Sequence, residues 1–383
     1  MKKKRLHLRN GLHRWIAIFI VGVISLFLVI GSLTSIDGKY RLGSSSIKQW
    51  ATNFSGETLM YLFGAENRYF TQVLAEETKP PALTTVLFEL ATNIKPNDPR
   101  SLLGRELPGF AFFDSKIIVA GQGTDYTTLP IESPPPIEDM LIEREASIDD
   151  VEDPEDTPIT PPSKTTEGRK VVYIYHTHSR ESFLPHLPEV KNIDQAYHSE
   201  VNITLVGERL GKEFERRGIG AIVETRDIQQ IVKDQGKKWN QSYDVSRSII
   251  QEAVSQNSDI KFIFDLHRDS HRRDVTTVTI DGETYARTFF VLGGENANYE
   301  ENEQMALKLH EMLQKKYPGL SRGSVVRKGT GVNGIYNQDI SDYSILIEIG
   351  GVDNSLEETY RTAEALADII SEYYWEIQGA SRQ

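Results

Sequence analysis

The stretch VVYIYHTHSRESF, residues 171–183, predicts a short buried β-strand that runs directly into a polar loop. Its first five residues are apolar or aromatic, as in a strand covered on both faces, and His176, His178 and Glu181 follow within six positions. Downstream, strand-like and helix-like patterns alternate almost to the end of the chain, which is typical of an α/β domain. We therefore expect residues 169–383 to form a mostly parallel or mixed twisted sheet with flanking helices.

Local signals mark the boundaries of several elements in this domain. Residues 201–217 show helical spacing that ends at a glycine. The dipeptide Asp281-Gly282 predicts a hairpin turn. Ser355-Leu-Glu-Glu358 has the spacing of a capping box at the start of the last helix.

Two further predicted strands also end in polar groups. Residues 261–269, KFIFDLHRD, carry His267 after an apolar run, and residues 345–351, ILIEIGG, hold Glu348 between isoleucines. Ligands of open α/β sheets bind beyond the carboxyl ends of the strands, so the polar segments of all three strands can meet at one edge. The sequence alone does not place them there.

These residues have the chemistry of a hydrolytic zinc site. If they meet, His178, Glu181 and His267 provide three ligands and leave a fourth position for water. Glu348 suits a general base, because the surrounding isoleucines would raise its pKa. A histidine after a strand is also commonly a hydrogen-bonded loop residue, and a carboxylate between isoleucines can face solvent. The residues alone therefore leave open a metal site or a polar loop.

The composition excludes several classes of function. The formal net charge of -12 argues against binding of a nucleic-acid backbone, and the lack of cysteine rules out disulfides, thiolate metal sites and a cysteine nucleophile. Ser179 and Ser182 lie near histidines but outside a Gly-x-Ser-x-Gly elbow, which disfavours serine catalysis. Four other histidines lack a comparable setting: His186, His198, His271 and His310.

The N-terminus predicts a membrane anchor. Trp15–Leu33 is an uncharged run of 19 residues, nearly enough to span a bilayer as a helix, and basic residues precede it. We predict a transmembrane anchor over residues 15–34, with residues 1–14 in the cytoplasm and the rest of the chain outside. A cleaved signal peptide is the alternative, although its apolar region is usually about 7–15 residues long and no good cleavage site follows here.

The rest of the chain divides by composition. Residues 36–128 hold short apolar patterns and predict a small membrane-proximal region of unknown fold. Residues 129–168 contain eight prolines and twelve acidic residues, which predicts an extended acidic linker; an acidic binding tail is the alternative. We expect residues 169–383 to form the catalytic domain that carries the candidate zinc site.

Five motifs in this order carry a resemblance to a known family: YHTHSRESF, FDLHRDS, YPGLSRG, YNQDIS and LIEIGG. Together with the predicted anchor, they resemble the stage II sporulation protein P family of endospore-forming bacteria. The resemblance implies a zinc-dependent N-acetylmuramoyl-L-alanine amidase, related in fold to the cell-wall amidase_3 group, with a second endopeptidase activity on peptide cross-links. It also implies a single-pass protein of the mother-cell membrane that faces the intermembrane space around the forespore during engulfment.

The resemblance also implies partners, namely the lytic transglycosylase stage II sporulation protein D and the membrane protein stage II sporulation protein M. Peptidoglycan would be the substrate, and the bond cleaved would join the lactyl group of N-acetylmuramic acid to L-alanine of the stem peptide. Two alternatives stay open. One is a zinc carboxypeptidase-like peptidase, and the other is a non-catalytic wall-binding assembly module.

Residue roles carried over from the family keep one choice open. The first histidine ligand corresponds to His178 and not to His176, the later one to His267, and the catalytic glutamate to Glu348. The carboxylate ligand is Glu181 by the family's own motif, or Glu200 by its spacing from the end of the first helix in the wider amidase group; we favour Glu181. The remaining polar residues are expected to support the ligands or touch substrate: His176, Arg268 and Asp269.

Overall fold

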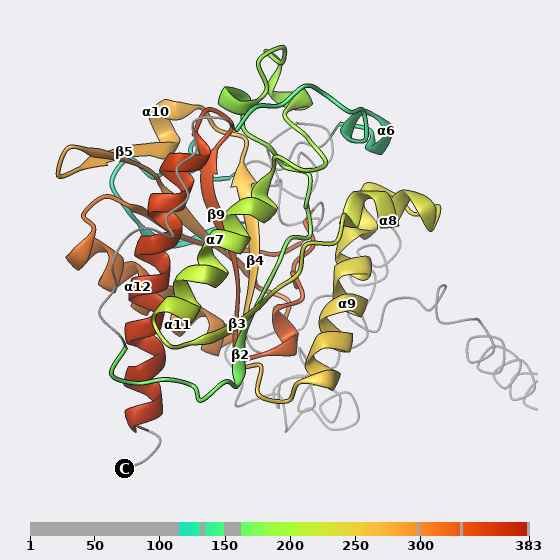
Figure 1. The fold of residues 1–383 in the computed structure, drawn as a ribbon. Coiled ribbons are helices and arrows are strands. Elements are labelled where there is room, and N and C mark those ends of the chain that lie inside the picture. The colour runs from blue at the N-terminus through green and yellow to red at the C-terminus, as the bar shows by residue number, and fades with distance from the viewer. Residues whose placement is uncertain (1–114, 131–134, 149–161, 297–298, 330–331, 381–383) are drawn as a thin grey trace, which may run out of the picture. The chain divides into compact units, whose positions relative to one another are not determined.

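The computed structural model describes residues 115–130, 135–148, 162–296, 299–329 and 332–380, which belong to a unit spanning Leu102–Gln383 (Figure 1). The predicted cytoplasmic segment 1–14, the anchor 15–34 and most of the membrane-proximal region 36–128 lie outside the described residues. No helix in the described part combines the length and apolar character needed to cross a bilayer.

A seven-stranded sheet with the order β1-β8-β7-β9-β4-β2-β3 forms the centre of the described residues. β3, β2, β4 and β9 run parallel, whereas β7 is antiparallel to β9, and β1 is antiparallel to β8. The strands are β1 (Lys116–Ala120), β2 (Lys170–Tyr175), β3 (Gly220–Val223), β4 (Phe262–Asp269), β7 (Thr288–Gly293), β8 (Ser321–Arg327) and β9 (Tyr343–Gly351). The predicted α/β class with a mixed sheet and flanking helices is confirmed.

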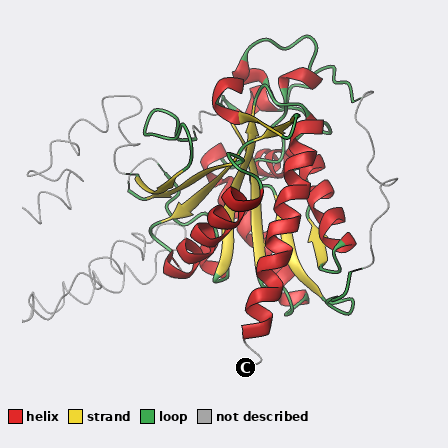
Figure 2. Cartoon of the chain, turned by 90° about the vertical axis from the view of Figure 1, so that its left-hand side faces the viewer, coloured by secondary structure: helices red, strands yellow, loops and turns green. Residues whose placement is uncertain are grey.

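Helices cover both faces of this sheet (Figures 1 and 2). One face carries α7 (Ile203–Arg216), α11 (Tyr299–Lys316) and α12 (Leu356–Ala380), and the other carries α8 (Ile228–Asp234) and α9 (Ser242–Gln256). β2 shows the division, because Ile174 packs with the first group and its neighbours Tyr173 and Tyr175 pack with α9. Burial on both faces explains why the strand is apolar or aromatic at every position after Lys170.

Two local signals act as predicted. β5 (Thr277–Ile280) and β6 (Glu283–Ala286) form a hairpin whose turn residues, Asp281 and Gly282, have φ values of 52° and 90°. At the start of α12, Ser355 N–H donates to Glu358 Oε2 over 3.2 Å and Glu358 N–H donates to Ser355 Oγ over 3.3 Å. This reciprocal pair is a capping box.

Six short helical turns complete the described elements. They are α6 (Ile137–Met140), η6 (Leu184–His186), η7 (Ile193–Gln195), η8 (Trp239–Gln241), α10 (Arg273–Thr276) and η9 (Gln338–Ile340). α6 belongs to a segment, residues 135–148, that we call the strap.

The folded unit begins earlier than the expected boundary at residue 169. β1 lies in the predicted membrane-proximal region, yet it pairs with β8 at the edge of the sheet. Leu129 and Met140, from the predicted linker, are each 1% exposed. Average composition did not predict these contacts, because the segment is polar overall. Its contacts depend on a few positions: β1 pairs with the edge of β8, and the side chains of Leu129 and Met140 are buried.

Candidate metal centre

Residues from the loop after β2 and from β4 meet in one buried cluster. His178, Glu181 and His267 each place a ligand atom within 4.8 Å of the other two. Nδ1 of His178 lies 3.5 Å from Glu181 Oε1, and Nδ1 of His267 lies 3.7 Å from Glu181 Oε2. Ligand atoms of a tetrahedral zinc ion are about 3.3–3.6 Å apart, so the carboxylate stands at near-ligand spacing from both imidazoles.

A tight turn after β2 brings the first two of these residues together. The Glu181 N–H donates to the His178 carbonyl over 3.1 Å, so the two side chains face one point. The Glu181 carbonyl accepts a hydrogen bond of 2.7 Å from the Ile203 N–H, which fixes the loop to the start of α7. The His-x-x-Glu spacing therefore works here through a turn and not through a helix.

His267 and Glu348 lie side by side on β4 and β9. They are register partners in a parallel pair, so their side chains leave the same face of the sheet from backbones about 4.8 Å apart. Both are buried, and the alternative in which Glu348 faces solvent is wrong. The two strands also continue through these polar residues instead of ending before them.

The cluster holds more acid than base. Asp265 Oδ1 lies 3.1 Å from His267 Nε2, at the opposite ring nitrogen from Glu181. Burial lowers the pKa of His267, but the carboxylates of Asp265, Glu181 and Glu348 outweigh burial and raise that pKa to about 10. Burial raises the pKa of Glu181, but the two histidines outweigh it and hold this pKa below its ordinary value. The site therefore favours a cation, either a proton or a metal ion.

Aromatic rings enclose both imidazoles. Trp239 stacks on His178 with ring centres 4.5 Å apart, and Tyr243 lies parallel to His267 at 6.4 Å. Trp239 is partly exposed, whereas the other side chains of the cluster are buried. The sequence analysis missed both rings, and their only signal is an aromatic pair, four residues apart, at the start of α9.

The two candidate carboxylate ligands have different surroundings. Glu181 is buried, and its Oε2 accepts a hydrogen bond of 2.9 Å from the Arg268 N–H. Glu200 is exposed and does not join the cluster; its N–H donates to His198 Nδ1 over 3.0 Å. The structure thus brings Glu181, and not Glu200, to the two histidines.

The three expected supporting residues have distinct contacts. His176 is buried with Nδ1 3.0 Å from the Glu224 carbonyl oxygen, and burial lowers its pKa to about 4 although that carbonyl opposes the effect. Arg268 holds Glu181 through its backbone and places its guanidinium over the Tyr197 ring at 5.9 Å.

Asp269 pairs away from the ligand cluster. Its carboxylate lies 2.6 Å from Arg322 Nη1 and 2.8 Å from His271 Nδ1. Burial would raise the pKa of Asp269, but His271 and Arg322 outweigh it and hold the pKa well below its ordinary value. These contacts tie β4 to β8 by charge.

The donor set fits zinc. Two imidazoles and one carboxylate are a common three-ligand set of hydrolytic zinc sites. Nδ1 of His267, which faces Glu181, is buried and has no hydrogen-bond partner in the described part of the chain, which is costly unless a ligand satisfies it. His178, Glu181 and His267 are therefore the residues that would hold the ion.

The strap contacts the loop that carries His178 and Glu181. Arg180, which lies between these two residues, donates from Nη1 to the Met140 carbonyl and contacts Glu143, both at 3.4 Å. Its Nε also donates to Asp227 at the start of α8 over 2.8 Å. The strap and α8 together hold the ligand loop from outside.

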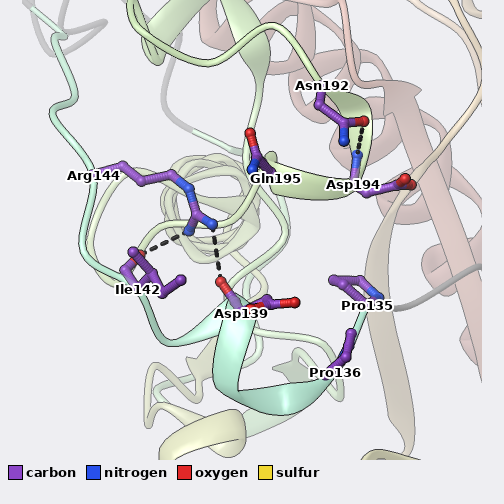
Figure 3. A pocket seen from close by; sticks show the side chains of 8 residues that line it. All are labelled: Pro135, Pro136, Asp139, Ile142, Arg144, Asn192, Asp194 and Gln195. Carbon is purple, nitrogen blue, oxygen red and sulfur yellow. Dashed lines mark hydrogen bonds between the residues drawn. The ribbon is translucent and has the colours of Figure 1, made fainter.

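A cavity of about 410 Å³ lies between the strap and the loop before α7 (Figure 3). Arg144 donates to the carbonyls of Ile142 and Asp139 over 2.7 and 2.9 Å and to the Tyr197 carbonyl over 3.3 Å, so its guanidinium links the strap to the loop before α7. The other lining residues are Pro135, Pro136, Asn192, Asp194 and Gln195. The metal cluster does not contribute to this lining.

A family model and a curated relative both match this chain, and both describe the same family. Residues 97–371 match the family model described as Stage II sporulation protein P (SpoIIP). The chain is 45% identical over 367 residues to stage II sporulation protein P of Bacillus subtilis (strain 168), which covers 95% of this chain and 92% of that protein.

A solved structure gives a weaker likeness. It is the CwlD amidase from Clostridioides difficile in complex with the GerS lipoprotein, with 16% identity and a TM-score of 0.34 over 55% of this chain and 100% of that chain. At that score the likeness carries no argument about this protein.

Proposed function

Because this chain belongs to the stage II sporulation protein P family, we propose that it is a zinc-dependent N-acetylmuramoyl-L-alanine amidase acting on peptidoglycan. The bond cleaved is the amide between the lactyl group of N-acetylmuramic acid and L-alanine of the stem peptide. The observation that supports the proposal is the buried cluster of His178, Glu181 and His267, in which His267 is the register partner of Glu348.

Each side chain has a task in this hydrolysis. His178, Glu181 and His267 would hold the ion, and Arg268 orients Glu181 through its backbone N–H. A zinc ion bound there would polarise the scissile carbonyl and lower the pKa of water. Glu348, next to His267 on the same face of the sheet, accepts the proton of the attacking water and delivers it to the leaving amine of L-alanine.

The surroundings of the cluster favour this chemistry. Trp239 and Tyr243 cover the two imidazoles and restrict water around them. Low local polarity strengthens each charge interaction among the buried carboxylates and imidazoles. The partly exposed Trp239 marks the side on which a stem peptide would approach.

The proposal extends to location and partners. The predicted anchor over residues 15–34 would hold the enzyme in the mother-cell membrane, with the catalytic unit in the intermembrane space during engulfment. Stage II sporulation proteins D and M would be its partners, and cleavage of peptide cross-links would be its second activity.

Digestion products test the proposed function. Full-length protein loaded with zinc is incubated with purified peptidoglycan, and the products are identified by mass spectrometry. We expect stem peptides with a free L-alanine N-terminus, and a loss of about 10²- to 10⁴-fold in their rate of release by Glu348→Gln. Glu200→Gln, an exposed change in the same unit, is the matched control and should release them at the wild-type rate.

Other products would identify the alternatives. Release of C-terminal amino acids alone would indicate a carboxypeptidase, and binding without release would indicate a wall-binding module. Undiminished release by Glu348→Gln would remove this glutamate from the mechanism.

A further inference from the structure

Asp265 joins the two chain segments that carry the candidate ligands. It lies on β4 two residues before His267, and its side chain is 1% exposed. Its Oδ1 accepts a hydrogen bond of 2.8 Å from the Thr177 N–H, and its Oδ2 accepts one of 2.7 Å from Thr177 Oγ1. Thr177 stands directly before His178 in the loop after β2, so one carboxylate contacts both segments.

The same carboxylate lies next to Nε2 of the His267 imidazole. Asp265 Oδ1 lies 3.1 Å from Nε2 as a charge contact, whereas Nδ1 of that ring lies 3.7 Å from Glu181 Oε2, and neither ring nitrogen is aligned for a hydrogen bond in the described part of the chain. The two ring nitrogens therefore have different neighbours: Nε2 lies next to Asp265, and Nδ1 faces the ligand cluster. A metal-bound histidine usually donates its other N–H to a carboxylate or carbonyl, which fixes its tautomer and orientation.

We propose that Asp265 is a positioning residue for the metal site: in the metal-bound protein its carboxylate, 3.1 Å from Nε2 of His267, accepts the Nε2–H and leaves Nδ1 free to bind the ion, and it holds the His178 loop in register through Thr177. The inference rests on the zinc site of the proposed function. A neutral amide at this position keeps the volume of the side chain but offers the imidazole a weaker acceptor and no charge.

Zinc affinity tests this role without any measurement of activity. Apo full-length protein is titrated with zinc in competition with a chromophoric chelator, for wild type, Asp265→Asn and Asp339→Asn. Asp339 pairs with Arg247 at 2.7 Å and does not belong to the ligand cluster, so its variant makes the same chemical change at a different charged pair. We expect the zinc Kd of Asp265→Asn to rise about 10- to 100-fold, with that of Asp339→Asn close to wild type.

The tautomer of His267 gives a second readout that does not depend on a folded variant. In zinc-bound wild-type protein labelled with ¹⁵N and ¹³C, the imidazole signal assigned to His267 through its backbone connectivities should show a proton on Nε2. A deprotonated Nε2 in wild type, or equal zinc Kd values for wild type and Asp265→Asn, would overturn the inference and leave the proposed function standing. A wild-type protein that binds no zinc would overturn the proposed function itself.

Discussion

Gly207 of α7 lies directly against the imidazole of His176: a Cβ at this glycine would stand 2.2 Å from His176 Nε2. No real side chain tolerates such a distance, so Gly207→Ala must displace a buried ring. We expect a loss of about 1–3 kcal/mol in the free energy of unfolding, measured by chemical denaturation.

A double-mutant cycle identifies the cause of that loss. In Gly207→Ala/His176→Ala the clash is gone, so the combined loss should be smaller than the sum of the single losses. Gly211→Ala is the matched control, because its Cβ would meet Val223 Cγ2 at 2.4 Å instead. Equal coupling of His176→Ala to both glycine variants would contradict this explanation.

Glu181 and Glu200 should differ in their effect on zinc content. Glu181→Gln removes the carboxylate that faces both histidines, so the zinc Kd should rise by more than the about 10- to 100-fold typical of an outer contact. Glu200→Gln changes an exposed side chain and should keep one zinc per chain, as measured by elemental analysis after dialysis. The reverse pattern would move the carboxylate ligand to Glu200.

His186 should make stability depend on pH. Its Nδ1 lies 2.9 Å from the Ser147 carbonyl oxygen, and its Nε2 accepts the Leu356 N–H at the start of α12 over 2.8 Å. Burial lowers the pKa of His186, although the Ser147 carbonyl opposes the effect. The unfolded state therefore binds the proton more readily, and the stabilisation is complete above the unfolded pKa of about 6.5 and lost as the pH falls.

The measurement compares wild type with His186→Ala. The difference in their free energies of unfolding should be largest near pH 7.5 and should narrow toward about pH 5, where a protonated ring no longer accepts the Leu356 N–H. A difference that stays constant with pH would show that His186 contributes through packing alone.

Truncation should show that the folded unit begins before residue 169. A fragment 169–383 lacks β1 and the strap, and so leaves the β8 edge unpaired and removes Leu129 and Met140 from their buried sites. Each of these two side chains is worth about 1.5–3 kcal/mol of burial, and an open edge favours association. Compared with fragment 102–383, fragment 169–383 should melt lower and sediment as larger species; equal behaviour would argue against this boundary.

The sequence predicts the sheet and the cluster better than it predicts their surroundings. Apolar runs followed by polar residues locate β2, β4 and β9, because strands buried on both faces have few other possible compositions. The meeting of His178 and His267 follows from the parallel pairing of β2 and β4, in which Tyr175 is opposite Asp265.

Other features have no local signal. Hydropathy predicts that β4 ends before His267, because the sequence pattern does not distinguish a buried polar residue within a strand from the first residue of a loop. The strand in fact continues to Asp269. Asp265 and Trp239 acquire their roles only from distant partners, Thr177 and His178, which no spacing in the sequence reveals.

The place of β1 in the chain has a mechanical consequence. Among the described elements, a pull from the N-terminal side reaches β1 first, then the strap, and only then the loop that holds His178 and Glu181. The antiparallel β1–β8 ladder must therefore yield before tension arrives at the ligands. In the described part of the chain, an edge strand outside the metal cluster thus stands between tension in the preceding chain and the loop that carries His178 and Glu181.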